Sequence, residues 1–435
     1  MSAEHLSLRV LALCGVLVGA ALGACATSPT AAPEAAPQPT AGLPFIEDDY
    51  AAALARAKAE NKPLFVDTWA PWCHSCLALK TEVFPDPALA AIADHFVWLA
   101  LDVDKPSAAP FLARFPSQAL PTLYVIDART EDAVLRWLGT ATAPQLVQLL
   151  EDARRTLPGV AAGATETAQA DTTAAARAAN LRVFELARNG QAAECAELAA
   201  SALGASQAGT VGRADVAVSG LGCALEMDAK DARRAPLVEQ LRVATLAIAE
   251  DPRVLTDDRS GAYSALVDAA KALGDASAAR GFATAWSALL DDAAARAPTG
   301  AARAAFDAHR VLAYLELGAG ERALPILAAS EREFPEDYNP AARTAYVLLQ
   351  LGRLDEALAA AARAKRLVYG PRRLRVLSLE ADIFEKQQDR AHAIAALDEA
   401  LAAAAALPEA QRSQKAIAAL TARRQKLAET AAPPR

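Results

Sequence analysis

The chain has 435 residues, 53% hydrophobic but only 5% aromatic, with a formal net charge of −8. This length suits two or three domains, and the abundance of alanine favours closely packed helices. The acidic balance, without a basic stripe, argues against nucleic acid as a partner, and the five scattered His residues predict no metal site.

The first 24 residues have the pattern of a signal peptide. Arg9 precedes an apolar run over residues 10–24, which is short for a membrane-spanning helix. The run leads into the sequence LGAC, whose cysteine is Cys25. This sequence resembles the bacterial lipobox, which implies lipidation of Cys25 and a mature chain that starts there. An ordinary secretory signal that is cleaved nearby is the alternative.

Residues 25–43 are rich in Pro, Ala and Thr and lack apolar periodicity, so we expect an extended tether. Acyl chains on Cys25 would hold the chain to a membrane by burying their methylene groups. Lipoproteins that stay in the inner membrane often carry Asp after the lipidated Cys. Ala26 stands there instead, so the resemblance implies a periplasm-facing anchor and favours the outer membrane.

Residues 44–158 predict a separate α/β domain, because strand and helix patterns alternate along them. The expected helices cover 46–60, 77–84, 87–94, 107–114 and 143–156. The expected strands cover 64–70, 97–104, 122–127 and 133–139.

Two cysteines, Cys73 and Cys76, mark the start of the helix that follows the first strand. A spacing of three residues places both thiols on one helix face, close enough to form a disulfide. Backbone N–H groups at a helix start stabilise a thiolate and can lower the thiol pKa to ~3.5–7.5. Two other interpretations are an inert structural disulfide and half of a zinc site, although no second C-x-x-C completes one.

The segment around this pair resembles the strand and active-site turn of the thioredoxin superfamily. The resemblance is carried by FVDTWAPWC, which ends at Cys73, and by the later sequence Leu120-Pro121-Thr122. It is closest to the thioredoxin-like domains of bacterial disulfide reductases and their periplasmic relatives. It implies a nucleophilic Cys73, a resolving Cys76 and no cofactor beyond the redox-active disulfide.

The same resemblance implies roles for five further residues. Asp67 matches the buried acid that helps to deprotonate the resolving thiol, and Pro121 matches a cis-proline that faces the disulfide. The three residues expected to contact a substrate are Trp72, His74 and Leu120. The alternative for Trp72 is that its side chain only packs in the domain and does not contact a substrate.

The chain also departs from the cytosolic members of this family. Ala100 stands where they place a Lys near the buried acid, and Leu77 replaces another Lys after the second cysteine. We therefore expect Asp67 to lack its usual charged partner, which puts its pKa and its role as proton carrier in question.

Residues 159–173 predict a second linker, and residues 174–430 have helical periodicity throughout. Leu317-Gly318 and Leu351-Gly352 recur 34 residues apart, and the segment 348–367 resembles a tetratricopeptide repeat. This resemblance implies stacked helix pairs that form a solenoid with a protein-binding face, or else a spacer without a ligand. Residues 174–255 predict either degenerate repeats or a separate bundle.

Cys195 and Cys223 fall in two helical stretches of this region. In an oxidising compartment they either form a structural disulfide or remain two small buried thiols. Both lie far along the chain from Cys73, so we do not expect them to take part in its chemistry.

Together, these features predict an α/β thioredoxin-like domain followed by an all-α, tetratricopeptide-like solenoid. The expected function is a membrane-anchored, periplasmic thiol–disulfide oxidoreductase that acts on protein disulfides and binds a client or partner protein on its repeats. Two alternatives remain. One is a lipoprotein scaffold with an auxiliary redox domain, and the other is copper(I) handling by the thiolates.

Overall fold

The computed structural model describes residues 42–117, 119–158, 167–205 and 212–429. The signal peptide, Cys25 and most of the tether lie outside these ranges, so the expectations about them stay predictions. Among the helices of the described ranges, none combines the length and the apolar character needed to cross a membrane.

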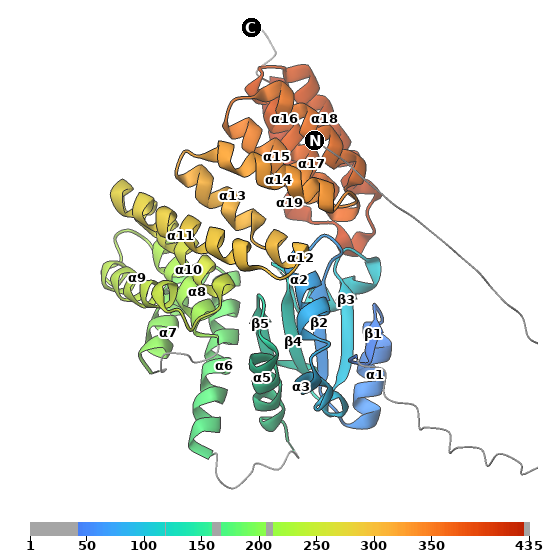
Figure 1. Cartoon of the computed structure of the whole chain (residues 1–435), viewed down its shortest axis with the longest axis vertical. Coiled ribbons are helices and arrows are strands. Elements are labelled where there is room, and N and C mark those ends of the chain that lie inside the picture. Colours follow the sequence, from blue (N-terminus) through green and yellow to red (C-terminus); the bar gives the residue numbers. More distant parts are fainter. Residues whose placement is uncertain (1–41, 118, 159–166, 206–211, 430–435) are drawn as a thin grey trace, which may run out of the picture. The chain divides into compact units, whose positions relative to one another are not determined.

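A five-stranded sheet in the order β1-β3-β2-β4-β5 forms the centre of the N-terminal domain (Figure 1). Strand β3 pairs in parallel with both β1 and β2, whereas β4 runs antiparallel to β2 and to β5. The strands are β1 Phe45–Glu47, β2 Leu64–Trp69, β3 Val97–Asp102, β4 Thr122–Asp127 and β5 Asp132–Leu138.

Helices cover both faces of this sheet, as the alternation of side chains along its strands requires. Leu64 and Val66 of β2 pack with α1 and α4 on one face, whereas Phe65 packs with α3 and α5 on the other. These helices are α1 Tyr50–Glu60, α3 Pro87–Ala90, α4 Ala109–Arg114 and α5 Ala143–Arg155. The predicted α/β fold is confirmed.

Two local predictions are wrong in detail. The helix expected from residue 46 starts only at Tyr50, with Asp49 as its N-cap, because Phe45–Glu47 adds a parallel strand to β3. The helix after the cysteine pair consists of α2, His74–Ala78, and a π-helical turn, Leu79–Val83. The β1 strand is too short to show a period of two in the sequence.

The remaining described residues are helical, which confirms the predicted all-α region. Helix α6 begins at Thr167, inside the segment that we expected to be a linker. The helices of this region are α6 Thr167–Arg188, α7 Ala192–Ala205, α8 Arg213–Glu226, α9 Arg234–Glu250, α10 Thr256–Ala272, α11 Ala276–Arg296, α12 Gly300–Ala304, α13 Asp307–Glu316, α14 Ala323–Glu333, α15 Tyr338–Gln350, α16 Leu354–Leu367, α17 Arg373–Lys386, α18 Arg390–Ala406 and α19 Gln414–Glu429.

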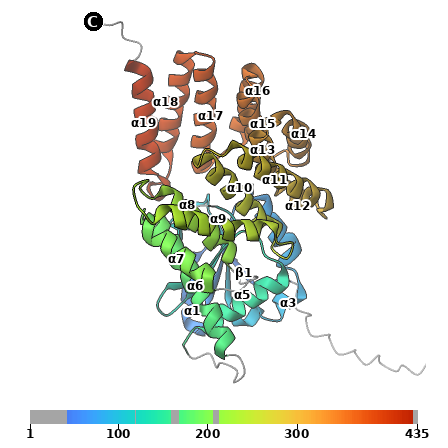
Figure 2. The same cartoon turned by 90° about the vertical axis from the view of Figure 1, so that its left-hand side faces the viewer.

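Successive helices of this region pack against one another in chain order (Figure 2). One hydrophobic cluster extends from Val183 of α6 to Ala313 of α13. Residues 174–255 therefore share a core with α10, α11 and Ala313 of α13.

The recurring Leu-Gly sequences mark the turns between paired helices. In three of these turns a Leu is the C-cap residue of a helix and the Gly that follows it has a positive φ, between 68° and 75°. These glycines are Gly274, Gly318 and Gly352. This left-handed conformation ends a helix at little cost only for residues such as Gly. The repeat seen in the sequence is therefore a repeat of turn geometry.

Candidate redox site

Cys73 and Cys76 form a disulfide at the start of α2, with 5.2 Å between their Cα atoms. Cys73 is the N-cap residue of α2, and its Sγ accepts a hydrogen bond of 3.2 Å from the backbone N–H of Cys76. Cys73 is 6% exposed, whereas Cys76 is fully buried. The exposure therefore matches an attacking Cys73 and a resolving Cys76.

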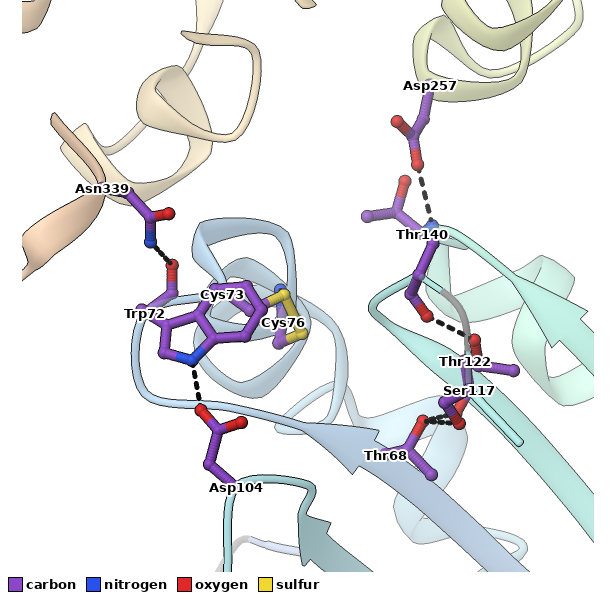
Figure 3. Close-up of a disulfide and its surroundings, with 11 residues drawn as sticks. Thr68, Trp72, Cys73, Cys76, Asp104, Ser117, Thr122, Thr140, Asp257 and Asn339 are labelled. Atoms are coloured by element: carbon purple, nitrogen blue, oxygen red, sulfur yellow. Dashed lines mark hydrogen bonds between the residues drawn. A yellow bond between two sulfur atoms is a disulfide. The ribbon is translucent and has the colours of Figure 1, made fainter. Parts of the chain in front are cut away.

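The loop before β4 lies beside the disulfide. The peptide bond between Leu120 and Pro121 is cis, and Leu120 packs against Ala70 and both cysteines. The next residue, Thr122, begins β4 and is bonded through its backbone oxygen to the hydroxyl of Thr68 (Figure 3). The structure thus brings together the two sequence motifs that we expected to meet.

Asp67 lies in the middle of β2, is fully buried, and has no hydrogen-bond partner among the described residues. Burial raises the pKa of this carboxyl from 3.8 to about 7, and the attraction of Lys80 partly opposes the rise. Such a pKa lets Asp67 take and return a proton near neutral pH.

Lys80 lies close enough to act on Asp67, and our sequence analysis missed it. It lies in the π-helical turn after α2, with its Nζ 3.3 Å from the centroid of the Trp69 ring. Ala100 is paired with Asp67 across the sheet, as expected, and supplies no charge. The cation that acts on Asp67 therefore comes from the helix that carries the cysteines.

Trp72 is covered by the helical region. Its indole N–H donates a bond of 2.5 Å to Asp104, and the guanidinium of Arg372 lies 4.4 Å from its ring centroid. Tyr338 contacts the ring edge-on, with 6.3 Å between the ring centroids. Figure 3 shows Asn339, which donates to the Trp72 backbone oxygen at 3.2 Å. Trp72 therefore contacts α15 and the N-cap residue of α17, and its contact with a substrate stays a prediction.

His74 also faces the helical region. Its Nε2 lies 3.1 Å from Oδ2 of Asp337, and its ring lies 4.5 Å from that of Phe334. Asp337 is the N-cap residue of α15. No sequence signal linked Phe334 or Asp337 to the redox motif, because only the tertiary fold brings them next to His74.

A cavity of about 340 Å³ adjoins the disulfide. Cys73, Leu120 and Gly139 are among the residues that the redox domain contributes to its wall, and helices α8, α10, α12, α13 and α15 contribute to the other side. Across this junction the backbone N–H of Thr140 donates to Asp257 at 3.3 Å (Figure 3). The redox pair thus opens onto a space that the two regions build jointly.

Cys195 and Cys223 are joined by a disulfide that links α7 to α8. Both residues are buried in the core of the helical region. Of the two alternatives left by the sequence, the structure contains the disulfide. No cluster of three or more metal-ligating side chains occurs within the described ranges.

Comparison with known proteins supports the assignment of the first domain. Residues 46–128 match a family model described as thioredoxin-like. The thiol:disulfide interchange protein DsbD of Pseudoalteromonas atlantica is 30% identical over 87 residues, which are 20% of this chain and 15% of that protein. The protein of the same name from Cronobacter sakazakii is 37% identical over 84 residues, 19% of this chain and 14% of that protein.

The chain therefore contains a thioredoxin-like domain, and it spans only about 15% of the length of these relatives. Among solved structures, a candidate disulphide isomerase from Bacteroides thetaiotaomicron is 31% identical. The match covers 28% of this chain and 97% of that one, with a TM-score of 0.23.

Proposed function

We propose that this protein is a membrane-anchored, periplasm-facing thiol–disulfide oxidoreductase. The observation that carries the proposal is the joined pair at the start of α2, with Cys73 at the surface of a cavity and Cys76 buried behind it. The relatives that match the domain are thiol:disulfide interchange proteins. The anchor is inferred from the lipobox-like sequence that ends at Cys25.

In this mechanism the thiolate of reduced Cys73 attacks a substrate disulfide and forms a mixed disulfide. Asp67 accepts the proton of Cys76, which then attacks Cys73 and releases the second substrate thiol. The raised pKa of Asp67 suits this task, because a general base works best with a pKa near the working pH.

We further propose that the helical region binds a client or partner protein. A groove of about 510 Å³ lies along α13, α15 and α17, and it ends at Trp72. Leu312 and Tyr346 line it with 42% and 39% of their surface exposed, and Arg372 and Arg375 flank them. Exposed apolar side chains beside Arg are typical of protein-binding surfaces. A protein disulfide bound here would be held near Cys73 at a high effective concentration.

The test is a glutathione redox titration of the full chain, with the state of Cys73 and Cys76 read by peptide mapping. We expect a reversible two-electron transition. A potential near ~−270 mV would indicate a reductase, and one near ~−120 mV a disulfide donor. A pair that glutathione does not open would contradict the proposal.

One observation favours a second candidate function, an interaction scaffold with an auxiliary redox domain. Tyr338, Asn339 and Arg372 cover Trp72, which leaves little of the redox centre exposed. Partner trapping in cells by a Cys76→Ser variant separates the two candidates. Mixed disulfides that a reductant releases support the oxidoreductase. Partners that are captured equally by a Cys73→Ser variant support the scaffold.

A further inference from the structure

The cavity beside Cys73 has the size of a site for a small molecule. Its volume of about 340 Å³ lies within the range of ~300–1,000 Å³ that is typical of ligand pockets. Cys73 and Leu120 form one side of it, and residues of α8, α10 and α13 form the other. The cavity is a candidate substrate site, because the reactive Cys73 lies on one wall and the other walls enclose the space beside it.

The surroundings of Cys73 limit what reaches its sulfur. Cys73 is 6% exposed, and Asn339 and Tyr338 contact the neighbouring Trp72. These contacts leave less room for a protein segment than for a small disulfide, whose size suits the cavity beside Cys73.

Three carboxylates face this cavity, namely Asp215 from α8 and Asp257 and Asp258 from α10. Asp257 accepts from the N–H of Thr140. Asp215 accepts from Asn180 at 3.5 Å and from the backbone of Leu138, and the charge of Arg136 acts on it. Within the described ranges, no hydrogen bond or ion pair is made to Asp258. Burial, Asp215 and Asp257 raise the pKa of Asp258 to about 8. Neighbouring carboxylates disfavour one another's ionised form, and an ammonium ligand near Asp257 and Asp258 would relieve this repulsion.

A cation lies on another wall. Arg343 of α15 lines the cavity, and its guanidinium makes no hydrogen bond or ion pair within the described ranges, although the charges of Asp337 and Asp307 act on it. Buried polar groups almost always have a partner, so these donors lack an acceptor. A carboxylate or carbonyl oxygen of a ligand would supply one.

His309 of α13 also lines the cavity. Its Nδ1 lies 2.6 Å from the hydroxyl of Ser260, which accepts a hydrogen bond from the indole of Trp286. The hydroxyl hydrogen of Ser260 is then available to His309, whose pKa burial also lowers. The net pattern of the cavity is therefore acidic on the side of α8 and α10, with one cation from α15.

We propose that this cavity binds a small disulfide of the amino-acid type, with its ammonium group at Asp257 and Asp258, its carboxylate at Arg343 and its sulfurs at Cys73. This inference rests on the proposed function and specifies the substrate of the same redox pair. It assigns the helical region a direct part in substrate selection, since it supplies all three charged contacts.

The reaction balances with the residues and substrate named. The Cys73 thiolate attacks one sulfur of the ligand, the S–S bond of the ligand breaks, and the first thiolate leaves. Cys76 loses its proton to Asp67 and attacks Cys73, which releases the second thiolate and restores the protein disulfide. Two electrons pass from the protein dithiol to the ligand.

The test uses the full chain with Cys76→Ser, reduced beforehand, and measures how fast Cys73 forms a mixed disulfide, by peptide mapping. Four small disulfides serve as probes and carry different charged groups: cystine, cystamine without carboxylates, 3,3′-dithiodipropionate without ammonium groups, and uncharged 2-hydroxyethyl disulfide. Each correct charged group should raise the rate by about tenfold, since a charge-assisted hydrogen bond contributes roughly that much. Cystine should therefore react fastest, and the uncharged probe slowest.

Equal rates for all four probes, or the fastest rate with dithiodipropionate, would overturn the inference and leave the oxidoreductase intact. Failure of Cys73 to react with every probe, including the uncharged one, would instead overturn the proposed function on which the inference rests.

Two variants test which residue holds each charged group of the ligand. Asp258→Asn should lower the cystamine rate about tenfold relative to the uncharged probe, and Arg343→Gln should do the same for dithiodipropionate. The matched control is Asp292→Asn on α11, whose side chain is 62% exposed and outside the cavity. An equal loss in the control, or no loss in Asp258→Asn, would contradict the assignment.

Discussion

His74 and Asp337 form a buried contact between the redox centre and the helical region. Their closest atoms are 3.1 Å apart, and their side chains are 3% and 7% exposed. His74 begins α2, and Asp337 caps α15. The contact therefore joins the element that carries the cysteines to the helix that covers Trp72.

We expect Asp337→Ala to loosen this junction, because it removes one partner of a buried pair and the N-cap of α15. In the reduced chain, the labelling of Cys73 by a maleimide with a long polyethylene glycol chain should then rise about tenfold relative to N-ethylmaleimide. The ratio should not change in Asp292→Asn, which alters an exposed ion pair on α11. If the long reagent labels the unaltered protein as fast as the short one, the helical region does not restrict access.

Asp67 should control how mixed disulfides are resolved. With a pKa of about 7, its carboxyl is neutral at pH 6 and ionised at pH 8, so the release of the second thiol should accelerate across this interval. Asp67→Asn should slow this step about 10²-fold at pH 8, as expected for loss of a general base, and flatten the pH profile. Stopped-flow measurement of mixed-disulfide decay gives the comparison. An unchanged profile in the variant would assign the proton transfer to another group.

The Asp67 carboxyl should also make the free energy of unfolding depend on pH. The folded state holds the proton up to about pH 7, whereas the unfolded chain releases it near the ordinary value of 3.8. The free energy of unfolding therefore falls as pH rises through this window. At pH 8 Asp67→Asn should be more stable than the unaltered protein, by ~2–4 kcal/mol, and below pH 4 this advantage should be lost. Urea unfolding at both pH values measures the difference.

Lys80 should help to set the pKa of Asp67. Its positive charge lowers the pKa of the buried carboxyl against the effect of burial. Lys80→Met keeps the aliphatic stem near Trp69 but removes the charge, so the midpoint of the pH profile should move upward. A downward shift, or none, would mean that the ammonium group does not act on Asp67. The pH dependence of mixed-disulfide decay is again the measurement.

The core of the redox site could be predicted because its signals are local in sequence. Cys73 and Cys76 lie one helical turn apart, and Asp67 lies in the strand that leads to them. The charged partner of Asp67 was missed because the expected position, Ala100, is on the neighbouring strand, whereas Lys80 acts from the following helix. Different elements can place the same charge at the same site.

The outer part of the site could not be predicted, because it depends on how the two regions pack. Asn339 reaches Trp72 across 267 residues of chain, and nothing near Asn339 marks it as part of a redox centre. The acidic wall has the same origin, since Asp215 and Asp257 lie on ordinary amphipathic helices. Periodicity assigned these helices correctly but could not show which face meets the disulfide.

The disulfide between Cys195 and Cys223 should stabilise the helical region without affecting the redox centre. It closes a loop with a sequence separation of 28, and both residues are buried between α7 and α8. The double variant Cys195→Ala/Cys223→Ala should lower the free energy of unfolding by about 2–4 kcal/mol. Its redox titration at Cys73 should match that of the unaltered protein. A shifted potential would show that the second disulfide takes part in the exchange.

Two glycines of α8 allow a matched test of how closely the helices pack. A Cβ atom at Gly220 would lie 2.3 Å from the Cβ of Ala199 on α7, whereas one at Gly222 would have no neighbour within 4 Å. Gly220→Ala should therefore push α7 and α8 apart and destabilise the protein by ~1–3 kcal/mol, as overpacked cores do. Gly222→Ala should instead stabilise it by ~0.5–1 kcal/mol, because alanine favours the helix. Thermal unfolding of both variants gives the comparison. Equal shifts of the same sign would show that α7 and α8 are not in close contact at Gly220.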